Sequence, residues 1–300
     1  MRLLKKKLFF IFNPFAGKGG IKNHLLGMID MFTKEGYEVT VYPTQKQGDG
    51  VDAVFHRGGQ YDVIACCGGD GTLDEVVTGM MKSGQNSTVL YIPAGSTNDF
   101  ANSLHLPKNM LRAAKEIIHG EEFPCDLGSF NEDYFVYIAA FGIFTDVSYE
   151  TKQDMKNVLG HMAYILEGMK RLSTIKSYQL KITCCNEVIK DEFIFGMITN
   201  SESVGGFKRI TGEFVELNDG EFEVTLIKRP KSALEMNNIL QALLLKDIDT
   251  DSMYCFRTNH IRIEAREEIP WTLDGEFGGK HKSVEINNLK QAFTIMRPKE

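Results

Sequence analysis

Short apolar runs alternate with helical patterns over residues 1–125, and this alternation constrains the fold more than any other feature of the chain. It is typical of β-α-β units, in which helices connect the strands of a parallel sheet. We expect strands at 7–13, 37–43, 62–67 and 88–92, and helices at 21–35, 52–57, 73–81 and 110–119. Every strand except the second runs into a loop rich in Gly, Asn or Asp. Ligands of open α/β sheets bind at the carboxyl ends of the strands, so these loops are the first candidates for a site.

The second half of the chain has strand-like segments with few helices between them. They lie at 134–141, 178–184, 193–199, 221–227, 259–264, 283–286 and 293–296, with helices expected at 152–172 and 233–245. This pattern predicts a mostly antiparallel β domain over residues 126–290. The helix at 152–172 carries a stripe of Met and Leu, for which core packing and the lining of an acyl-chain cleft both stay open.

Charge, apolar-run length and cysteine spacing exclude several classes of protein. The formal net charge of −6 argues against a protein that coats nucleic acid. No apolar run approaches the roughly 18 residues of a membrane-spanning helix, and the N-terminus lacks a signal-peptide cleavage pattern. The six cysteines form no C-x-x-C pair, which favours buried thiols in a reducing compartment. We therefore expect a cytoplasmic protein.

Glycine-rich loops follow the first, third and fourth expected strands: NPFAGKGG at 13–20, GGDGT at 68–72 and AGSTND at 94–99. Backbone N–H groups that no side chain covers can approach an anion, and a helix N-terminus favours negative charge. The GGDGT loop holds more Gly than a tight turn needs, and its Asp70 would be in reach of Mg²⁺ on bound phosphates. Because a loop carboxylate supports no core, we expect Asp70→Ala to abolish turnover with little loss of stability. The three loops together predict one nucleotide site.

The motifs N-P-x-A-G-K, G-G-D-G-T and G-S-T-N-D, in this order and spacing, resemble the catalytic domain of the diacylglycerol kinase family. Four motifs of the second half extend the resemblance: Asp126-Leu127-Gly128, Gly205-Gly206-Phe207-Lys208, Leu217-Asn218-Asp219-Gly220 and Asp274-Gly275-Glu276-Phe277-Gly278-Gly279. It covers nearly the whole chain and is strongest for the bacterial soluble diacylglycerol kinases. It implies a Rossmann-like α/β domain of the phosphofructokinase and NAD kinase type, with the nucleotide in the interdomain cleft. It also implies that the last strand, about 291–300, returns to the first domain.

The resemblance further implies roles for individual residues. ATP would be held by Asn13, Pro14, Phe15, Ala16, Gly17, Thr44, Gly68, Gly69, Asp70, Gly71, Thr72, Glu75 and Ser96. A structural Mg²⁺ would be bound near Asp219, with backbone oxygens from Glu216 and Glu221, and Asp70 and Asp126 would complete an acidic network. The catalytic base would be Asp274 or Glu276. The chain departs from the family pattern at Asp74, Ser96 and Asn218, where Asn, Thr and Asp are common.

The segment Asp274-Gly275-Glu276 also has an interpretation from its residues alone. Two carboxylates one residue apart on an extended chain point from the same side of it, and phosphoryl transfer to an alcohol needs an acceptor for the hydroxyl proton. An Asp-Gly pair is, however, ordinarily found in a hairpin turn. The residues by themselves leave both interpretations open.

These features predict an ATP- and Mg²⁺-dependent lipid kinase that phosphorylates diacylglycerol to phosphatidic acid. A kinase for a sphingoid or a soluble acceptor such as NAD, and a catalytically silent nucleotide-binding regulator, are the alternatives. The expected partner is a lipid substrate at the membrane surface, reached by transient contact of basic clusters with the inner membrane face. We expect no nucleic-acid partner, and a homodimer is left open.

Overall fold

The computed structural model describes residues 6–143, 175–204, 207–208, 215–245 and 251–299. The chain divides into two compact units: Met1–Cys125 with Gln291–Glu300 form unit 1, and Asp126–Lys290 form unit 2. The helix expected at 152–172 lies outside the described residues. Within the described ranges, none of the helices has both the length and the apolar character that crossing a membrane requires.

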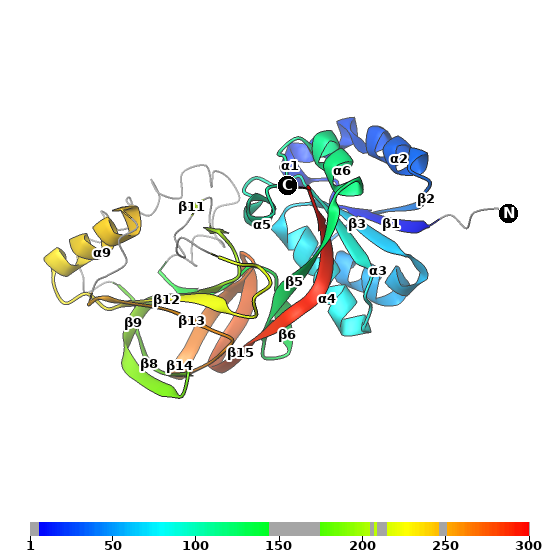
Figure 1. Ribbon diagram of the computed structural model, residues 1–300. Coiled ribbons are helices and arrows are strands. Elements are labelled where there is room, and N and C mark those ends of the chain that lie inside the picture. The colour runs from blue at the N-terminus through cyan, green and yellow to red at the C-terminus, as the bar shows by residue number, and fades with distance from the viewer. Residues whose placement is uncertain (1–5, 144–174, 205–206, 209–214, 246–250, 300) are drawn as a thin grey trace. The chain divides into compact units, whose positions relative to one another are not determined.

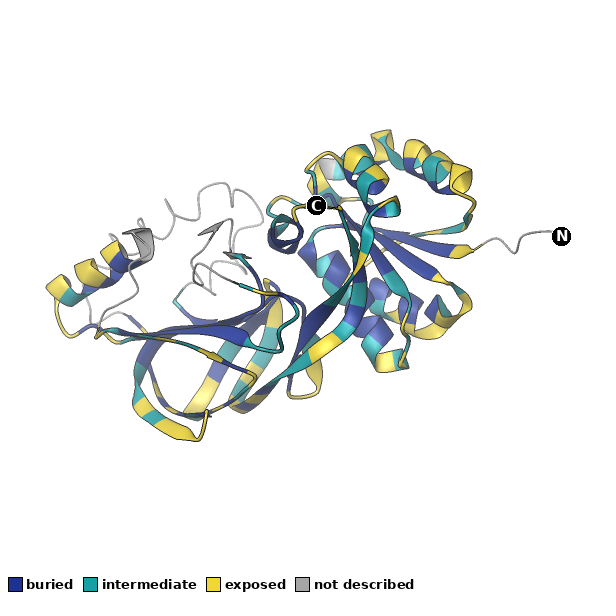
Figure 2. Cartoon of the chain, in the orientation of Figure 1, coloured by how far each residue is buried: buried dark blue, intermediate teal, exposed yellow. Residues whose placement is uncertain are grey.

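Unit 1 is built on a parallel sheet, in which β1 (Lys7–Phe12) lies between two other strands. β1 pairs with β2 (Glu38–Pro43) on one side and β3 (Val63–Gly68) on the other, and β3 pairs in turn with β4 (Thr88–Pro93). The end of β15 (Glu276–Arg297) lies parallel to β4, where Ile295 is opposite Val89. β1, β3 and β4 are buried along nearly their whole length, as strands with helices on both faces are (Figure 2).

The helices of unit 1 cover the sheet in two groups. α2 packs against α6, and α3 packs against α4 on the opposite side of the sheet (Figure 1). Their bounds are α1 Ala16–Gly19, α2 Leu25–Lys34, α3 Asp49–Arg57, α4 Asp70–Ser83, α5 Asp99–Ser103 and α6 Met110–Ile118, with 3-10 turns at Gly20–Asn23 and Gly58–Gln60. The expected strands and the alternation with helices are confirmed.

Two helix starts differ from the sequence-based expectation. α2 begins at Leu25 and not near residue 21, because a 3-10 turn occupies Gly20–Asn23 and ends at His24. α4 begins at Asp70, so the carboxylate expected in a loop lies in the first helical turn. The five-residue helix α5 was not expected, since so short a helix shows no apolar period.

Unit 2 is built from antiparallel strands. β7 and β8 each pair with both β9 and β14, β12 lies between β9 and β13, and β5 pairs with β6. The bounds are β5 Glu121–Phe130, β6 Asp133–Phe135, β7 Ile138–Gly142, β8 Tyr178–Cys184, β9 Glu187–Thr199, β10 Ser203–Val204, β11 Phe207–Lys208, β12 Phe222–Lys228, α9 Ala233–Leu245, β13 Met253–Thr258 and β14 His260–Leu273. The expected antiparallel, strand-rich second half is therefore confirmed.

The core of unit 2 centres on the single tryptophan of the chain. Trp271 on β14 is 1 % exposed, and its ring contacts Phe130 and Phe141 at centroid distances of 5.1 and 4.8 Å. The two strands expected at 283–286 and 293–296 are parts of one strand, β15. The residues between them are mostly polar, so the sequence pattern does not predict that the strand continues through them.

Candidate functional site

The three glycine-rich loops of unit 1 meet at the carboxyl ends of β1, β3 and β4. The backbone N–H of Asn13 donates to the carbonyl oxygen of Cys67 (3.0 Å), which joins the first loop to β3. Gly17 has φ +55°, and a Cβ there would lie 2.3 Å from the carbonyl oxygen of Ala94. A Cβ on Gly95 would lie 2.6 Å from Cα of Gly69. Glycine is thus required at these two positions for the loops to approach each other this closely. The meeting of the loops agrees with the prediction that they lie at one edge of the sheet.

The first loop combines a local side-chain hydrogen bond with one exposed aromatic side chain. The side chain of Asn13 is used locally, since its Oδ1 accepts from the backbone N–H of Phe15 (2.9 Å). Phe15 itself is 76 % exposed. In the third loop the Asn98 amide both accepts from and donates to the backbone of Gly95 (2.8 and 2.9 Å), which leaves the exposed Ser96 at the tip of a fixed turn. Sequence reasoning missed Asn98, although an Asn at φ +52° is typical of such a turn.

Asp70 connects the second loop to the third. It is buried, and its carboxylate accepts hydrogen bonds from the backbone N–H groups of Asp99 (3.0 Å) and Phe100 (3.3 Å) and from the hydroxyl of Tyr91 (3.3 Å). The two amides belong to the first turn of α5, where a carboxylate is favourable. The premise that Asp70 supports no core is therefore wrong, because its removal would leave buried donors without this acceptor.

Glu75 holds the loop that carries Thr44. One carboxylate oxygen of Glu75 accepts from the backbone N–H of Gly48 (2.7 Å) and the other from that of Gly50 (2.8 Å). Asp49, which sequence reasoning missed, accepts from the backbone N–H of Gln45 (2.6 Å) inside the same loop. Thr44 is buried, and its N–H donates to the carbonyl oxygen of Phe12 at the end of β1. Glu75 thus positions the loop that carries Thr44 by accepting two of its backbone hydrogen bonds.

The two carboxylates of Asp274-Gly275-Glu276 lie in different environments. Asp274 and Gly275 both have positive φ (50° and 84°), and Leu273 pairs with Glu276, which describes a two-residue hairpin turn between β14 and β15. Asp274 is 5 % exposed, whereas Glu276 is exposed. The expectation that both point from one side of an extended chain is wrong, because the turn directs Asp274 into unit 2.

Asp274 is surrounded by backbone donors. Its carboxylate accepts hydrogen bonds from the N–H groups of three consecutive residues: Val136 (2.5 Å), Tyr137 (3.0 Å) and Ile138 (2.9 Å). These bonds explain why the strand expected at 134–141 is divided into β6 and β7, since the amides between them turn toward Asp274. The oxygens of this carboxylate are thus occupied by donors of the chain itself.

Asp126 and the turn at Asn218–Gly220 lie together in unit 2. Asp126 is completely buried, and its carboxylate accepts from the backbone N–H of Gly220 (2.6 Å). The backbone N–H of Asp126 donates to the carbonyl oxygen of Leu217 (2.8 Å), and the Asn200 amide donates to its carbonyl oxygen (3.2 Å). Sequence reasoning did not find Asn200, which lies 74 residues from its partner.

Asp219, the expected metal ligand, is paired with a cation of the chain itself. The Arg257 guanidinium forms an ion pair with Asp219 and lies 3.3 Å from Glu221 and 3.4 Å from Glu223. Burial raises the pKa of the Glu223 carboxyl to about 7, against the opposing attraction of Arg257. In the part of the chain that the structure describes, no group of three or more His, Cys, Asp or Glu side chains is arranged to hold a metal ion.

Comparison with known proteins gives consistent matches along the chain. The family model described as "Diacylglycerol kinase catalytic domain" matches residues 7–130, and that described as "YegS C-terminal NAD kinase beta sandwich-like domain" matches residues 139–296. A diacylglycerol kinase of Bacillus subtilis (strain 168) is 32 % identical over 297 residues, which cover 98 % of this chain and 97 % of that protein. One of Staphylococcus carnosus (strain TM300) is 31 % identical over 299 residues, which cover 99 % and 97 %. A crystal structure of a diacylglycerol kinase from Bacillus anthracis str. Sterne has the same fold, with a TM-score of 0.77, 24 % identity and coverage of 99 % of this chain and 98 % of that one.

Proposed function

This chain belongs to the diacylglycerol kinase family, and on that premise we propose that it transfers the γ-phosphoryl group of ATP to the hydroxyl of diacylglycerol, giving phosphatidic acid and ADP. The observation that carries the proposal is the meeting of three glycine-rich loops at the carboxyl ends of β1, β3 and β4. Such a meeting places uncovered backbone amides at the edge of a parallel sheet where ligands of α/β folds bind.

The residues of unit 1 would divide the work of holding ATP. The backbone of residues 13–17 and 68–72 would lie against the phosphates, and the exposed hydroxyl of Ser96 would donate to a phosphate oxygen. Asp70 and Glu75 would hold the loops in place through the amides that they bond. Mg²⁺ on the ATP phosphates, with Asp70 as its candidate protein ligand, would neutralise the charge that phosphoryl transfer develops.

Glu276 is the base that the geometry favours over Asp274. The new P–O bond forms at the lipid hydroxyl, the bond from the γ-phosphorus to the β,γ-bridging oxygen breaks, and ADP leaves with that electron pair. The hydroxyl proton must pass to an acceptor that substrate can reach. Glu276 is exposed to solvent, whereas Asp274 is buried and bonded to three amides. Asp274 would be a positioning residue that fixes the turn carrying Glu276.

The proposal includes where the reaction takes place. Its lipid substrate resides in a membrane, so the enzyme would be cytoplasmic and contact the inner membrane face transiently. A homodimer remains open as the assembly. Of the other acceptors, a sphingoid base resembles diacylglycerol in carrying a free hydroxyl together with long hydrocarbon, whereas NAD has no long hydrocarbon chain. A direct comparison of the three acceptors therefore separates the alternatives.

The test follows label from [γ-³²P]ATP into diacylglycerol or sphingosine in mixed micelles and into NAD in buffer. We expect label in phosphatidic acid, and Glu276→Gln to lower kcat by roughly 10²–10⁴-fold with an unchanged KM for ATP. Glu267→Gln, which removes an exposed carboxylate of β14, is the matched control and should behave as wild type. Transfer to NAD alone would favour the soluble acceptor, and ATP binding without transfer to any acceptor would favour a silent regulator.

A further inference from the structure

Arg257 lies at the centre of three carboxylates in unit 2. It stands on β13 directly opposite Glu223 of β12, and it forms ion pairs with Asp219, with Glu221 (3.3 Å) and with Glu223 (3.4 Å). The Glu223 side chain is buried and that of Asp219 largely so. Three carboxylates this close repel one another unless a cation lies among them, and burial increases the cost of leaving them unpaired.

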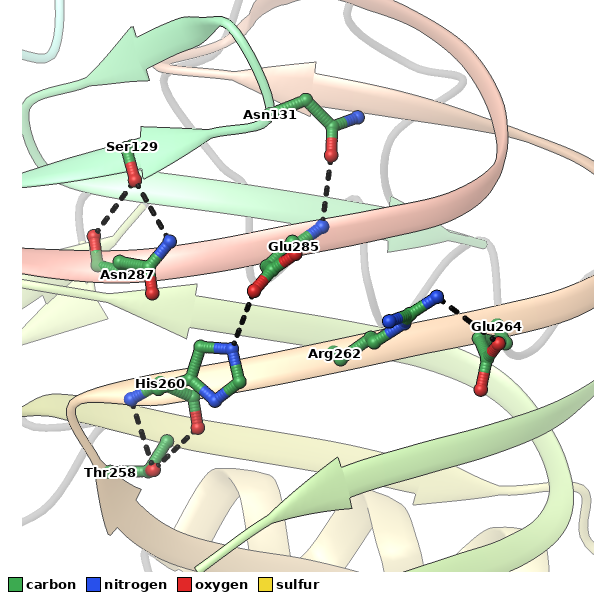
Figure 3. Close-up of polar contacts among 8 residues, drawn as sticks. All are labelled: Ser129, Asn131, Thr258, His260, Arg262, Glu264, Glu285 and Asn287. Carbon is green, nitrogen blue, oxygen red and sulfur yellow. Dashed lines mark hydrogen bonds and ion pairs between the residues drawn. The ribbon is translucent and has the colours of Figure 1, made fainter.

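The strand that carries Arg257 is fixed at its end. The hydroxyl of Thr258 donates to the carbonyl oxygen of His260 (2.8 Å) and accepts from its backbone N–H (3.3 Å), as Figure 3 shows. These bonds close the turn from β13 to β14 one residue after Arg257. The guanidinium therefore extends from a rigid base, and its planar set of five N–H donors suits several carboxylates at once.

The same turn is where the family resemblance implies a structural Mg²⁺. Of the Asp219 carboxylate, Oδ1 accepts from the backbone N–H of Glu221 (2.9 Å) and Oδ2 is paired with Arg257. A divalent cation at this carboxylate would have to displace the guanidinium or lie beside its positive charge. The residues present thus do not fit Mg²⁺ at this turn, and the proposed reaction uses none there.

We propose that Arg257 is the resident cation of the turn at Asn218–Gly220, supplying internally the charge that the resemblance assigns to a structural metal ion. The consequence extends beyond the three carboxylates, because the turn also donates the backbone N–H of Gly220 to the buried Asp126. Arg257 thereby positions Asp126 without needing a divalent cation. This inference is independent of the acceptor that the kinase uses.

The test measures thermal unfolding of the full chain without nucleotide, in EDTA and in millimolar MgCl₂. We expect the wild-type midpoint to be the same in both, and Arg257→Gln to lower the midpoint by roughly 5 °C or more, as loss of a partly buried cation does in a unit of this size. Arg257→Lys, which keeps the charge without the planar donors, should lie between the two, and it replaces Arg257→Gln if that variant does not fold.

Arg262→Gln is the matched control. Arg262 lies on β14, the next strand in the sequence, is about half exposed, and pairs with Glu264 at 3.6 Å on the surface (Figure 3). Its replacement should leave the midpoint unchanged. The proposal is overturned if Mg²⁺ raises the wild-type midpoint and Asp219→Asn abolishes the rise, or if Arg257→Gln is as stable as Arg262→Gln.

Discussion

Replacing Asp274 by Ala tests whether this carboxylate holds structure or performs chemistry. The substitution removes the acceptor of three backbone N–H groups, on Val136, Tyr137 and Ile138, and all three residues are buried. Each buried donor left without a partner costs about 1–3 kcal/mol. Because three adjacent donors relax together, we expect a total loss of about 3–6 kcal/mol in the free energy of unfolding. That is a large part of the roughly 5–15 kcal/mol by which domains are stable.

The chain carries its own reporter for this measurement. Trp271 is the only tryptophan, is 1 % exposed and precedes Asp274 by three residues, so its fluorescence follows the unfolding of unit 2 in urea. Asp274→Asn keeps one acceptor oxygen and should lose less stability than Asp274→Ala. Glu276→Gln should unfold as wild type while losing activity, because its side chain is exposed. An Asp274→Ala variant within about 1 kcal/mol of wild type would refute the reasoning.

Three further expectations follow from the same contacts. Glu75→Gln keeps one acceptor oxygen for the two backbone N–H groups that Glu75 binds, so one charge-assisted hydrogen bond is lost. We expect this loss to loosen the loop that carries Thr44 and to raise the KM for ATP about tenfold, as measured by steady-state kinetics. An unchanged KM would contradict this. Burial raises the pKa of the Cys67 thiol to about 12, so iodoacetamide at pH 8 should label the exposed Cys185 and spare Cys67 in peptide mass spectra; equal labelling would show that unit 1 opens. The pKa of Glu223 is about 7 in the folded chain, against the ordinary value of 4.5 in the unfolded chain. Protonated Glu223 therefore contributes to the free energy of unfolding in full below pH 4.5, and this contribution is lost as the pH rises through 7. Glu223→Gln should therefore flatten the fall of stability between pH 4.5 and 7, and a fall as steep as in wild type would assign it to other groups.

The sequence predicts the strands and the glycine loops because both depend on short-range patterns. The apolar run of β1 marks a buried strand by its own composition, and the glycines of GGDGT mark the junction between a strand and a helix. The loops also follow strands of a parallel sheet, which is sufficient to bring them to one edge. These features could therefore be placed without knowing any tertiary contact.

The roles of the carboxylates could not be predicted, because their partners are remote. Asp274 bonds amides 136–138 residues away, Asp70 bonds amides 29 and 30 residues away, and Arg257 reaches Asp219 across 38 residues. The packing of distant segments decides these contacts, and a local sequence pattern does not reveal partners so far away along the chain. The hairpin turn at Asp274–Gly275 was one of two interpretations of its residues, and only the amides that surround Asp274 distinguish them.

The acidic residues of the family motifs fall into two groups: carboxylates that accept backbone hydrogen bonds from another segment, and carboxylates that are exposed. Asp70, Glu75 and Asp274 each accept at least two backbone N–H groups from another segment, so each connects two parts of its own unit. Replacing any of them would displace a loop and lower activity even if the side chain never touched substrate. Lost turnover is therefore informative about chemistry only for a carboxylate such as Glu276, which is exposed. For the other three, a stability measurement must accompany the kinetics. Both a positioning and a catalytic residue lower the rate when they are replaced, but loss of the positioning residue also lowers the free energy of unfolding.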